Sequence, residues 1–163
     1  MDLSVVIPLY NEEESVRPLY AAVVAVLDQL PLKSELLLVD DGSRDRTWEV
    51  LRTVAASDAR VRAVRFRRNF GQTPAMAAGI DLARGRIIVT MDGDLQNDPA
   101  DIPEFLTHIE RGYDLVVGWR HNRQDKMLTR KIPSRIANWM IGRITGVPIR
   151  DNGCSLKAYR ADI

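Results

Sequence analysis

The strongest constraint on the fold is a short apolar run that ends in two aspartates, at residues 87–94 (IIVTMDGD). Its β-branched, nearly continuous apolar pattern is typical of a strand buried on both faces of a parallel sheet. In parallel α/β sheets, ligands bind beyond the carboxyl ends of the strands. If the backbone stays extended here, Asp92 and Asp94 point the same way, because side chains alternate along a strand.

Two carboxylates at such an edge predict a site for a hard divalent cation. Mg²⁺ and Mn²⁺ prefer oxygen ligands and keep coordination positions open for water and substrate phosphates. The alternative is an acidic turn that caps the next helix. The D-x-D pattern alone does not separate these two interpretations, because so short a motif recurs by chance.

The same order of apolar strand, polar turn and helix recurs along the chain. Strands are expected at residues 3–9, 36–39, 61–65, 87–89, 115–118 and 156–159, and helices at about 11–30, 47–56, 74–83, 102–111 and 133–145. This alternation predicts parallel strands, right-handed crossovers and helices on both faces of the sheet. Asn11 is the expected N-cap of the first helix, with Glu12, Glu13 and Glu14 in its first turn. Neither G-x-G-x-x-G nor G-x-x-x-x-G-K-[ST] occurs, which excludes the two common glycine-rich phosphate loops.

Length and composition narrow the class of protein. A chain of 163 residues predicts one domain with a single core, and a formal net charge of +1 argues against a general nucleic-acid binder. The single cysteine, Cys154, excludes an internal disulfide framework and fits a reducing compartment. No apolar run approaches the ~20 residues of a membrane-spanning helix, and the start lacks a basic signal-peptide region. The chain is therefore expected to be soluble and cytoplasmic. Because it stops at Ile163 without a terminating signal, it is expected to be a fragment.

A second acidic pair, Asp40 and Asp41, ends the strand at residues 36–39. One of the two is expected to face inward and accept N–H bonds of the turn, and the other to face the ligand crevice. A register slip of one residue exchanges these roles. Beyond Trp119 the chain is polar and basic, and Arg120 is a candidate ligand contact at a strand end. The amphipathic helix expected at residues 133–145 could face solvent, an anionic membrane or a phosphate group.

Four motifs in this order resemble glycosyltransferase family 2, the inverting sugar transferases of GT-A fold. They are residues 6–12 (VIPLYNE), 39–43 (VDDGS), 69–71 (NFG) and 91–96 (MDGDLQ). Residues 112–114 (GYD), 123–125 (RQD) and 151–154 (DNGC) further resemble its polyprenyl-phosphate branch. That branch includes dolichyl-phosphate mannose synthases, bactoprenol glucosyltransferases and undecaprenyl-phosphate aminoarabinose transferases, and the last are the most similar.

The resemblance implies a single GT-A catalytic domain over residues 1–163, an α/β, Rossmann-like and mostly parallel sheet with helices on both faces. Members of this branch continue into interfacial and transmembrane helices, so the resemblance also implies that the chain is truncated before them. For the nucleotide sugar it implies contacts from Pro8, Tyr10, Glu12, Val39, Asp40, Asp41, Asp92, Gly93 and Arg120, with Asp41 on the base, Gly93 allowing close approach to the ribose and Arg120 on the diphosphate. Metal ligands would be Asp92, Asp94 and Gln96, and the catalytic residues Asp94 and Asp151.

The expected function is that of a metal-dependent, inverting glycosyltransferase (EC class 2.4) at the cytoplasmic face of the membrane. It would move a sugar from a UDP- or GDP-sugar to undecaprenyl or dolichyl phosphate, using Mg²⁺ or Mn²⁺, with Arg123, Arg130 and Lys131 gripping the acceptor phosphate. A phosphate monoester has a second pKa near ~6 and is largely deprotonated at pH 7. Asp151, the base that the resemblance implies, would therefore orient the acceptor more than deprotonate it.

Two alternatives stay open. The first is a family 2 transferase that acts on a polysaccharide or another soluble acceptor through the same donor site. The second is a non-catalytic nucleotide-binding domain of the same fold, which the retained pair Asp92 and Asp94 disfavours. No nucleic-acid partner is expected, peripheral membrane contact is expected of the full-length protein, and a homo-oligomer is allowed.

Overall fold

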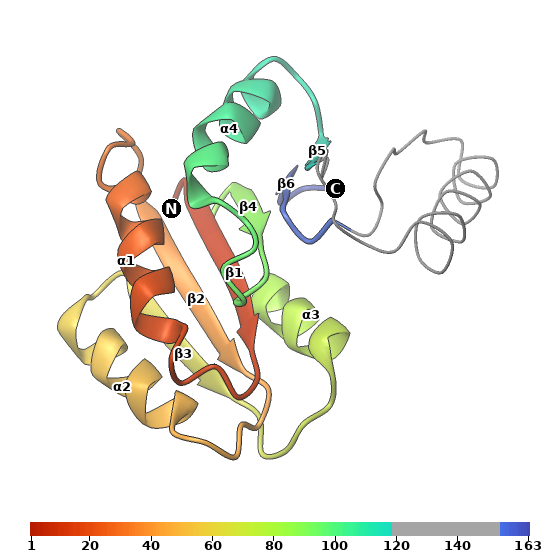
Figure 1. Cartoon of the computed structure of the whole chain (residues 1–163). Helices are drawn as coiled ribbons and strands as arrows, with labels where there is room; N and C mark the ends of the chain where they lie inside the picture. The colour runs from red at the N-terminus through yellow and green to blue at the C-terminus, as the bar shows by residue number, and fades with distance from the viewer. Residues whose placement is uncertain (119–153) are drawn as a thin grey trace, which may run out of the picture. The chain divides into compact units, whose positions relative to one another are not determined.

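The computed structural model describes residues 1–118 and 154–163 (Figure 1). In chain order its elements are β1 (Leu3–Leu9), α1 (Val16–Leu27), β2 (Ser34–Asp40), α2 (Thr47–Ser57), β3 (Val61–Arg65), α3 (Gln72–Leu82), β4 (Ile87–Thr90), a 3₁₀ turn η1 (Pro99–Asp101), α4 (Ile102–Glu110), β5 (Leu115–Val117) and β6 (Lys157–Arg160). The chain divides into two units, Met1–Val116 with Leu156–Ile163, and Val117–Ser155. Among the described helices, none combines the length and apolarity needed to cross a bilayer.

The described strands form one sheet in the order β3-β2-β1-β4-β6-β5. β1 pairs in parallel with both β2 and β4, and β2 pairs in parallel with β3. β6 pairs antiparallel with β4, with Lys157 opposite Thr90. The mostly parallel sheet predicted from the alternating pattern is confirmed, whereas the antiparallel insertion of β6 next to β4 has no counterpart in that pattern.

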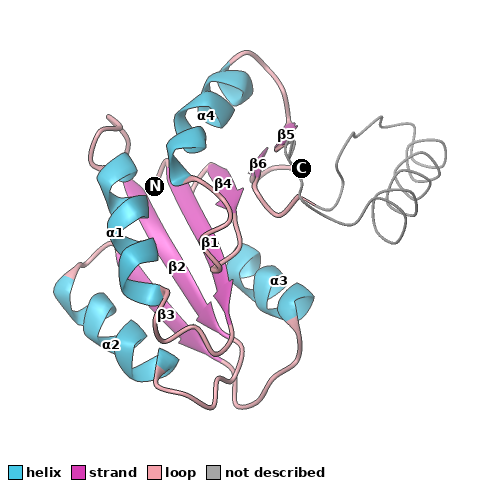
Figure 2. Cartoon of the chain, viewed as in Figure 1, coloured by secondary structure: helices cyan, strands magenta, loops and turns pink. Residues whose placement is uncertain are grey.

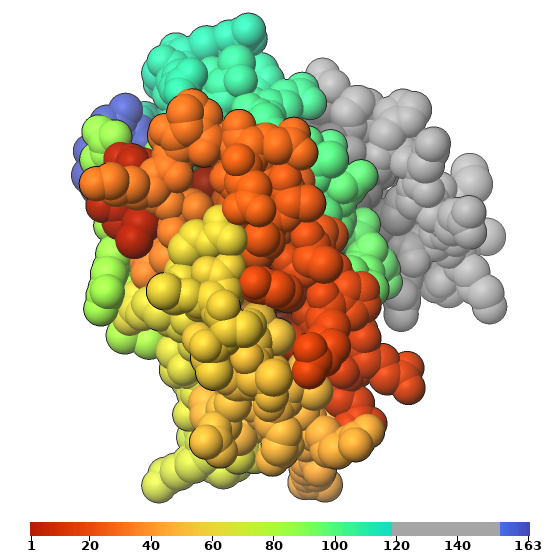
Figure 3. All heavy atoms as spheres, turned by 90° about the vertical axis from the view of Figure 1, so that its left-hand side faces the viewer, coloured from red at the N-terminus to blue at the C-terminus, as the bar shows by residue number. Residues whose placement is uncertain are grey.

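The two longest strands are buried along their whole length, because helices cover both faces of the sheet. Every residue of β1 and of β2 is buried. On one face, Val6, Leu37 and Ile88 pack against α3 through Met76 and Ile80. Figure 2 shows α1 in front of the strands and α3 behind them. Figure 3, turned by 90°, shows α1 and α2 side by side, in agreement with their contacts. The near-continuous apolar pattern of these strands is thus explained by burial on both faces.

The first helix begins later than the sequence pattern predicts, and the expectation of an N-cap at Asn11 is wrong. Asn11 has a positive φ of 55°, and α1 starts at Val16. The backbone N–H groups of Asn11 and Glu12 donate to Ser43 Oγ (2.9 Å) and Thr47 Oγ1 (2.8 Å). These hydrogen bonds join the segment after β1 to the loop after β2, and Ser15 N and Val16 N then donate to Glu12 O in the turn that leads into α1.

Asp58 joins the end of α2 to α1. Its carboxylate accepts hydrogen bonds from the guanidinium of Arg60 (2.8 Å) and from the hydroxyl of Tyr20 on α1 (3.0 Å). The hydrogen bond from Arg60 lowers the pKa of the Asp58 carboxyl from 3.8 to about 2. Since the folded-state pKa is the lower one, this contribution to stability is complete above the unfolded pKa and is lost as the pH falls through the folded pKa.

We expect Asp58→Asn to lower the melting temperature at pH 7 and to flatten its decline between about pH 4 and pH 2. Circular dichroism melts across this pH range measure both effects. Asp81→Asn, at an exposed position of α3, is the matched control and should follow the wild type. Parallel declines for the wild type and Asp58→Asn below pH 4 would contradict the assignment.

Candidate active site

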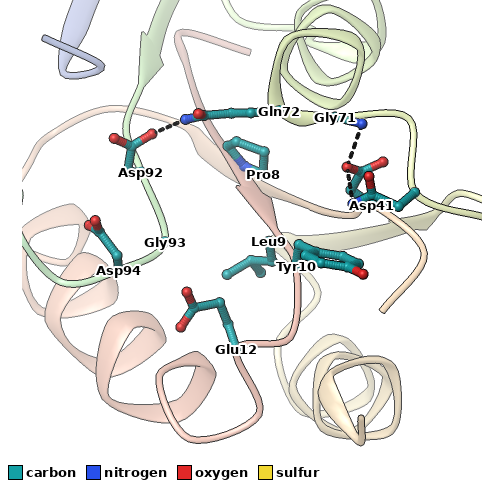
Figure 4. A pocket seen from close by; sticks show the side chains of 11 residues that line it. Pro8, Leu9, Tyr10, Glu12, Asp41, Gly71, Gln72, Asp92, Gly93 and Asp94 are labelled. Atoms are coloured by element: carbon teal, nitrogen blue, oxygen red, sulfur yellow. Dashed lines mark hydrogen bonds between the residues drawn. The ribbon is translucent and has the colours of Figure 1, made fainter. Parts of the chain in front are cut away.

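A cavity of about 290 Å³ lies at the carboxyl ends of β1, β2 and β4 (Figure 4). Its lining comes from four segments of the chain and consists of Pro8, Leu9, Tyr10, Glu12, Asp41, Asn69, Gly71, Gln72, Asp92, Gly93 and Asp94. Because β1 lies between β2 and β4, this is the point at which the strand order reverses. Open α/β sheets bind their ligands in the crevice at such a point.

A larger cavity, of about 530 Å³, lies by the first residues of β1 and β4. Among its lining side chains, Arg86 pairs with Asp2 (3.0 Å) and Arg160 with Asp162 (3.3 Å). The charges of these two arginines are thus balanced by neighbouring acids. The cavity lies at the amino ends of β1 and β4, whereas parallel sheets bind ligands at the carboxyl ends of their strands. The smaller cavity is therefore the candidate active site.

Asp92 and Asp94 both line the cavity although the backbone that carries them has left the sheet. β4 ends at Thr90. Gly93, between the two acids, is pressed against the end of β1: a Cβ at this position would lie 2.3 Å from Leu9 Cδ2 and 3.1 Å from Pro8 O. A side chain at residue 93 would displace the end of the Leu9 side chain and crowd the carbonyl oxygen of Pro8. Approach of Gly93 to a ribose stays a prediction.

The two acids have different local partners. Asp94 is exposed, and its Oδ1 accepts a hydrogen bond from Gln96 N (3.1 Å). Asp92 Oδ1 accepts a hydrogen bond from Gln72 Nε2, and Asp92 N donates to Asn97 Oδ1 (3.3 Å). Gln96, predicted as a third metal ligand, is exposed and lies outside the lining of the cavity. Of this segment, the carboxylates of Asp92 and Asp94 thus reach the cavity, whose lining also includes Glu12 and Asp41.

This set of oxygens fits a cation that is shared with a phosphorylated ligand. In residues 1–118 and 154–163, no group of three or more His, Cys, Asp and Glu side chains is placed to hold a metal by itself. Mg²⁺ is commonly bound by one or two carboxylates, with substrate phosphates and water completing its octahedron. Asp92 and Asp94 meet that requirement, since both line a cavity with room for a ligand.

The register of β2 separates the roles of Asp40 and Asp41. Asp40 is fully buried: its Oδ1 accepts a hydrogen bond from Ser43 N (2.9 Å), and its Oδ2 lies 3.2 Å from Arg65 Nε without hydrogen-bond geometry. Asp41 lines the cavity. The inward-facing residue is thus Asp40, which holds the turn, and the residue at the crevice is Asp41.

Asp41 also organises the loop that follows β3. Its carboxylate accepts hydrogen bonds from Asn69 Nδ2 (2.9 Å), Phe70 N (2.8 Å) and Gly71 N (2.8 Å). A carboxylate offers roughly four acceptor positions, so about one remains for a ligand. The NFG motif is visible in the sequence, but no local pattern predicts a role for Asn69, Gly71 or Gln72, because their contacts with Asp41 and Asp92 join distant parts of the chain.

The structure brings most of the predicted donor-site residues together. Pro8, Tyr10, Glu12, Asp41, Asp92, Gly93 and Asp94 line the cavity. Val39 is fully buried in β2 and, like Asp40 and Gln96, lies outside the lining. Arg120, Arg123, Arg130, Lys131 and Asp151, and the helix expected at residues 133–145, lie outside the described residues. Their roles stay predictions.

Comparisons with known proteins show which sequences this chain is similar to. The family described as Glycosyl transferase family 2 matches residues 4–163. The dodecaprenyl-phosphate galacturonate synthase of Rhizobium johnstonii is 56% identical over 165 residues, which cover 100% of this chain and 49% of that protein. The undecaprenyl-phosphate 4-deoxy-4-formamido-L-arabinose transferase of Pseudomonas fluorescens is 45% identical over 162 residues, covering 99% and 47%. The chain thus spans about half the length of the curated relatives it matches.

A solved structure supports the fold. The glucosyl-3-phosphoglycerate synthase of Mycobacterium tuberculosis, crystallised with Mn²⁺, uridine diphosphate and phosphoglyceric acid, superposes with a TM-score of 0.73. It is 21% identical in sequence, and the match covers 99% of this chain and 56% of that one. At this level of identity the likeness concerns the fold, which is the GT-A arrangement of a mostly parallel sheet between helices.

Proposed function

Because the chain belongs to glycosyl transferase family 2, we propose that it supplies the donor site of an inverting enzyme that transfers a sugar from a nucleotide sugar to a polyprenyl phosphate. The observation that carries the donor half of this proposal is that Asp92 and Asp94 line one cavity with Pro8, Tyr10 and Asp41. The acceptor half is supported by the names of the relatives, both of which act on polyprenyl phosphates.

In the proposed donor complex, each end of the cavity binds one part of the nucleotide sugar. Tyr10 and Asp41 lie toward the base, and the remaining acceptor position of Asp41 suits a base N–H donor. Asp92 and Asp94 would hold Mg²⁺ or Mn²⁺, as the Mn²⁺ in the solved relative supports. The cation would offset the charge that develops on the departing diphosphate. Arg120 would add a second cationic contact to that diphosphate.

The chemical step needs little proton transfer from the protein. An oxygen of the acceptor phosphate forms the new bond to the anomeric carbon as the bond from that carbon to the diphosphate oxygen breaks. Since a phosphate monoester is already largely ionised near pH 7, the acceptor reaches the site as a nucleophile. Asp151 would orient it, and Arg123, Arg130 and Lys131 would bind its charge.

The setting of this reaction is also part of the proposal. We infer that residues 1–163 form the catalytic GT-A domain of a longer protein and that it works at the cytoplasmic face of a membrane. The relatives are about twice as long as this chain, which leaves room for segments that bind the lipid. A homo-oligomer is compatible with this arrangement.

Transfer of a labelled sugar tests the proposed function. The full-length protein is incubated with nucleotide sugars that carry galacturonate or 4-deoxy-4-formamido-L-arabinose, the sugars in the relatives' names, each as its UDP and GDP derivative. We expect label in detergent-solubilised undecaprenyl phosphate only when Mg²⁺ or Mn²⁺ is present. Label in a soluble sugar acceptor would favour the first alternative, and metal-dependent binding of UDP or GDP without any transfer would favour the non-catalytic one.

A further inference from the structure

The side chain of Gln72 makes a contact that the proposed reaction does not use. Gln72 is the first residue of α3 and is exposed, and its Nε2 donates a hydrogen bond to Asp92 Oδ1 across the cavity (Figure 4). The contact joins the start of α3 to the segment that follows β4, 20 residues further along the chain. A surface glutamine with freedom to turn to solvent is thus directed at one of the two carboxylates proposed to bind the cation.

The backbone that carries Gln72 is held by Asp41. Gly71, which precedes Gln72, has a φ of 100° and donates its N–H to Asp41. The loop before it also rests on Gly42, where a Cβ would lie 2.3 Å from Arg68 C. The start of α3 has no side-chain cap of its own, so its position is set by Asp41 and by this close backbone approach.

These contacts form a continuous series from the base end of the cavity to its carboxylate end. Asp41 holds the loop of residues 69–71, the loop fixes the start of α3, and Gln72 at that start holds Asp92. A hydrogen bond to one oxygen of a carboxylate leaves its other lone pairs available. Such a donor fixes the orientation of the group without blocking a cation.

We propose that Gln72 is a positioning residue for the cation site: its amide orients Asp92, and Asp41 maintains the loop that makes this contact possible. The inference rests on the proposed donor site. Hydrogen-bond partners that orient metal-binding carboxylates typically contribute 10–100-fold to metal affinity. Asp41 then has a structural task in the unliganded protein besides any contact with a nucleotide base.

Binding of Mn²⁺ alone, measured by electron paramagnetic resonance on the purified full-length protein, tests the proposal without any turnover. Gln72→Met keeps the length of the side chain and removes the donor, and we expect it to weaken Mn²⁺ binding by about 10-fold. Asp41→Asn should weaken it in the same direction, because an amide cannot accept all three hydrogen bonds of the loop. Thr73→Ala, one residue further along α3, exposed and outside the lining, is the control and should bind as the wild type does.

The outcomes separate this inference from the proposed function. If Gln72→Met binds Mn²⁺ as tightly as the wild type, or more tightly, while melting at the wild-type temperature, the positioning role is overturned. Unchanged affinity in Asp41→Asn would overturn the part assigned to the loop. If the wild type binds no Mn²⁺, either alone or with UDP or GDP, the donor site itself fails and the role of Gln72 fails with it.

Discussion

Replacing Asp94 with alanine is expected to lower the rate of sugar transfer roughly 10³-fold at saturating donor. Asp94 supplies one of the two carboxylates proposed to bind the cation, and its loss would leave the cation held by Asp92 alone. A cation at a departing diphosphate contributes several kcal/mol of charge stabilisation, and about 1.4 kcal/mol corresponds to one decade in rate. Steady-state kinetics of the full-length enzyme, with Mg²⁺ and with Mn²⁺, measure this loss.

The comparison with Asp151→Asn makes the test more specific. If the acceptor phosphate arrives ionised, Asp151 serves to orient it, and Asp151→Asn should cost far less than Asp94→Ala. Asp81→Ala, on α3 and outside the cavity, is the control for a lost surface carboxylate. Equal losses for Asp94→Ala and Asp151→Asn would contradict this division of roles, and full activity of Asp94→Ala would contradict the cation site.

Replacing Glu35 with leucine is expected to lower the free energy of unfolding by about 3 kcal/mol. Glu35 is buried in β2 and accepts hydrogen bonds from Ser4 Oγ (2.7 Å), Arg62 Nη1 (2.9 Å) and Arg84 N (2.7 Å). Burial raises the pKa of the Glu35 carboxyl, but these hydrogen bonds outweigh it and leave the pKa below its usual value. Removing one member of a buried ion pair typically costs 3–5 kcal/mol, and the partly exposed Arg62 places this case near ~3 kcal/mol.

Urea denaturation at pH 7 measures this change. Glu104→Leu on α4 is the control, because the side chain of Glu104 is 79% exposed and its substitution should change stability by less than about 0.5 kcal/mol. A loss below about 1 kcal/mol for Glu35→Leu would mean that water replaces the carboxylate as partner of Arg62 and of Arg84 N. The result would also show how firmly the turn before β4 is held, since Arg84 lies between α3 and β4.

The local sequence pattern was sufficient to predict the positions of most of the strands. β1 and β3 have the predicted bounds, and β2 extends the predicted run by a few residues. Short, continuous apolar runs between polar turns are typical of strands when both faces of a sheet are covered, as they are here. The two acidic strand ends were recognised for the same reason, because Asp41 and Asp92 follow directly from such runs.

Other features of the fold could not be predicted from the local pattern, because they depend on contacts between residues that are distant in the sequence. The expected start of α1 is absent because Asn11 has a positive φ of 55°, at a position where its N–H donates to Ser43 Oγ in a distant loop. The antiparallel β6 depends on pairing with β4, which no local periodicity encodes. The contact of Gln72 with Asp92 belongs to the same class. Sequence spacing indicated several of the residues that line the cavity, whereas tertiary hydrogen bonds determine how they are oriented.

At the reversal of strand order beside β1, most of the cavity lining lies on connecting segments outside the sheet ladder, and only Pro8 and Leu9 belong to a strand. Such segments tolerate changes in sequence and length better than the strands that they join. In the proposed donor site, selection for a new sugar or nucleotide could therefore act on these connections while the thermal stability of the domain is conserved. An exchange of residues 69–72 between relatives would be a direct way to alter substrate preference in a scaffold that still folds.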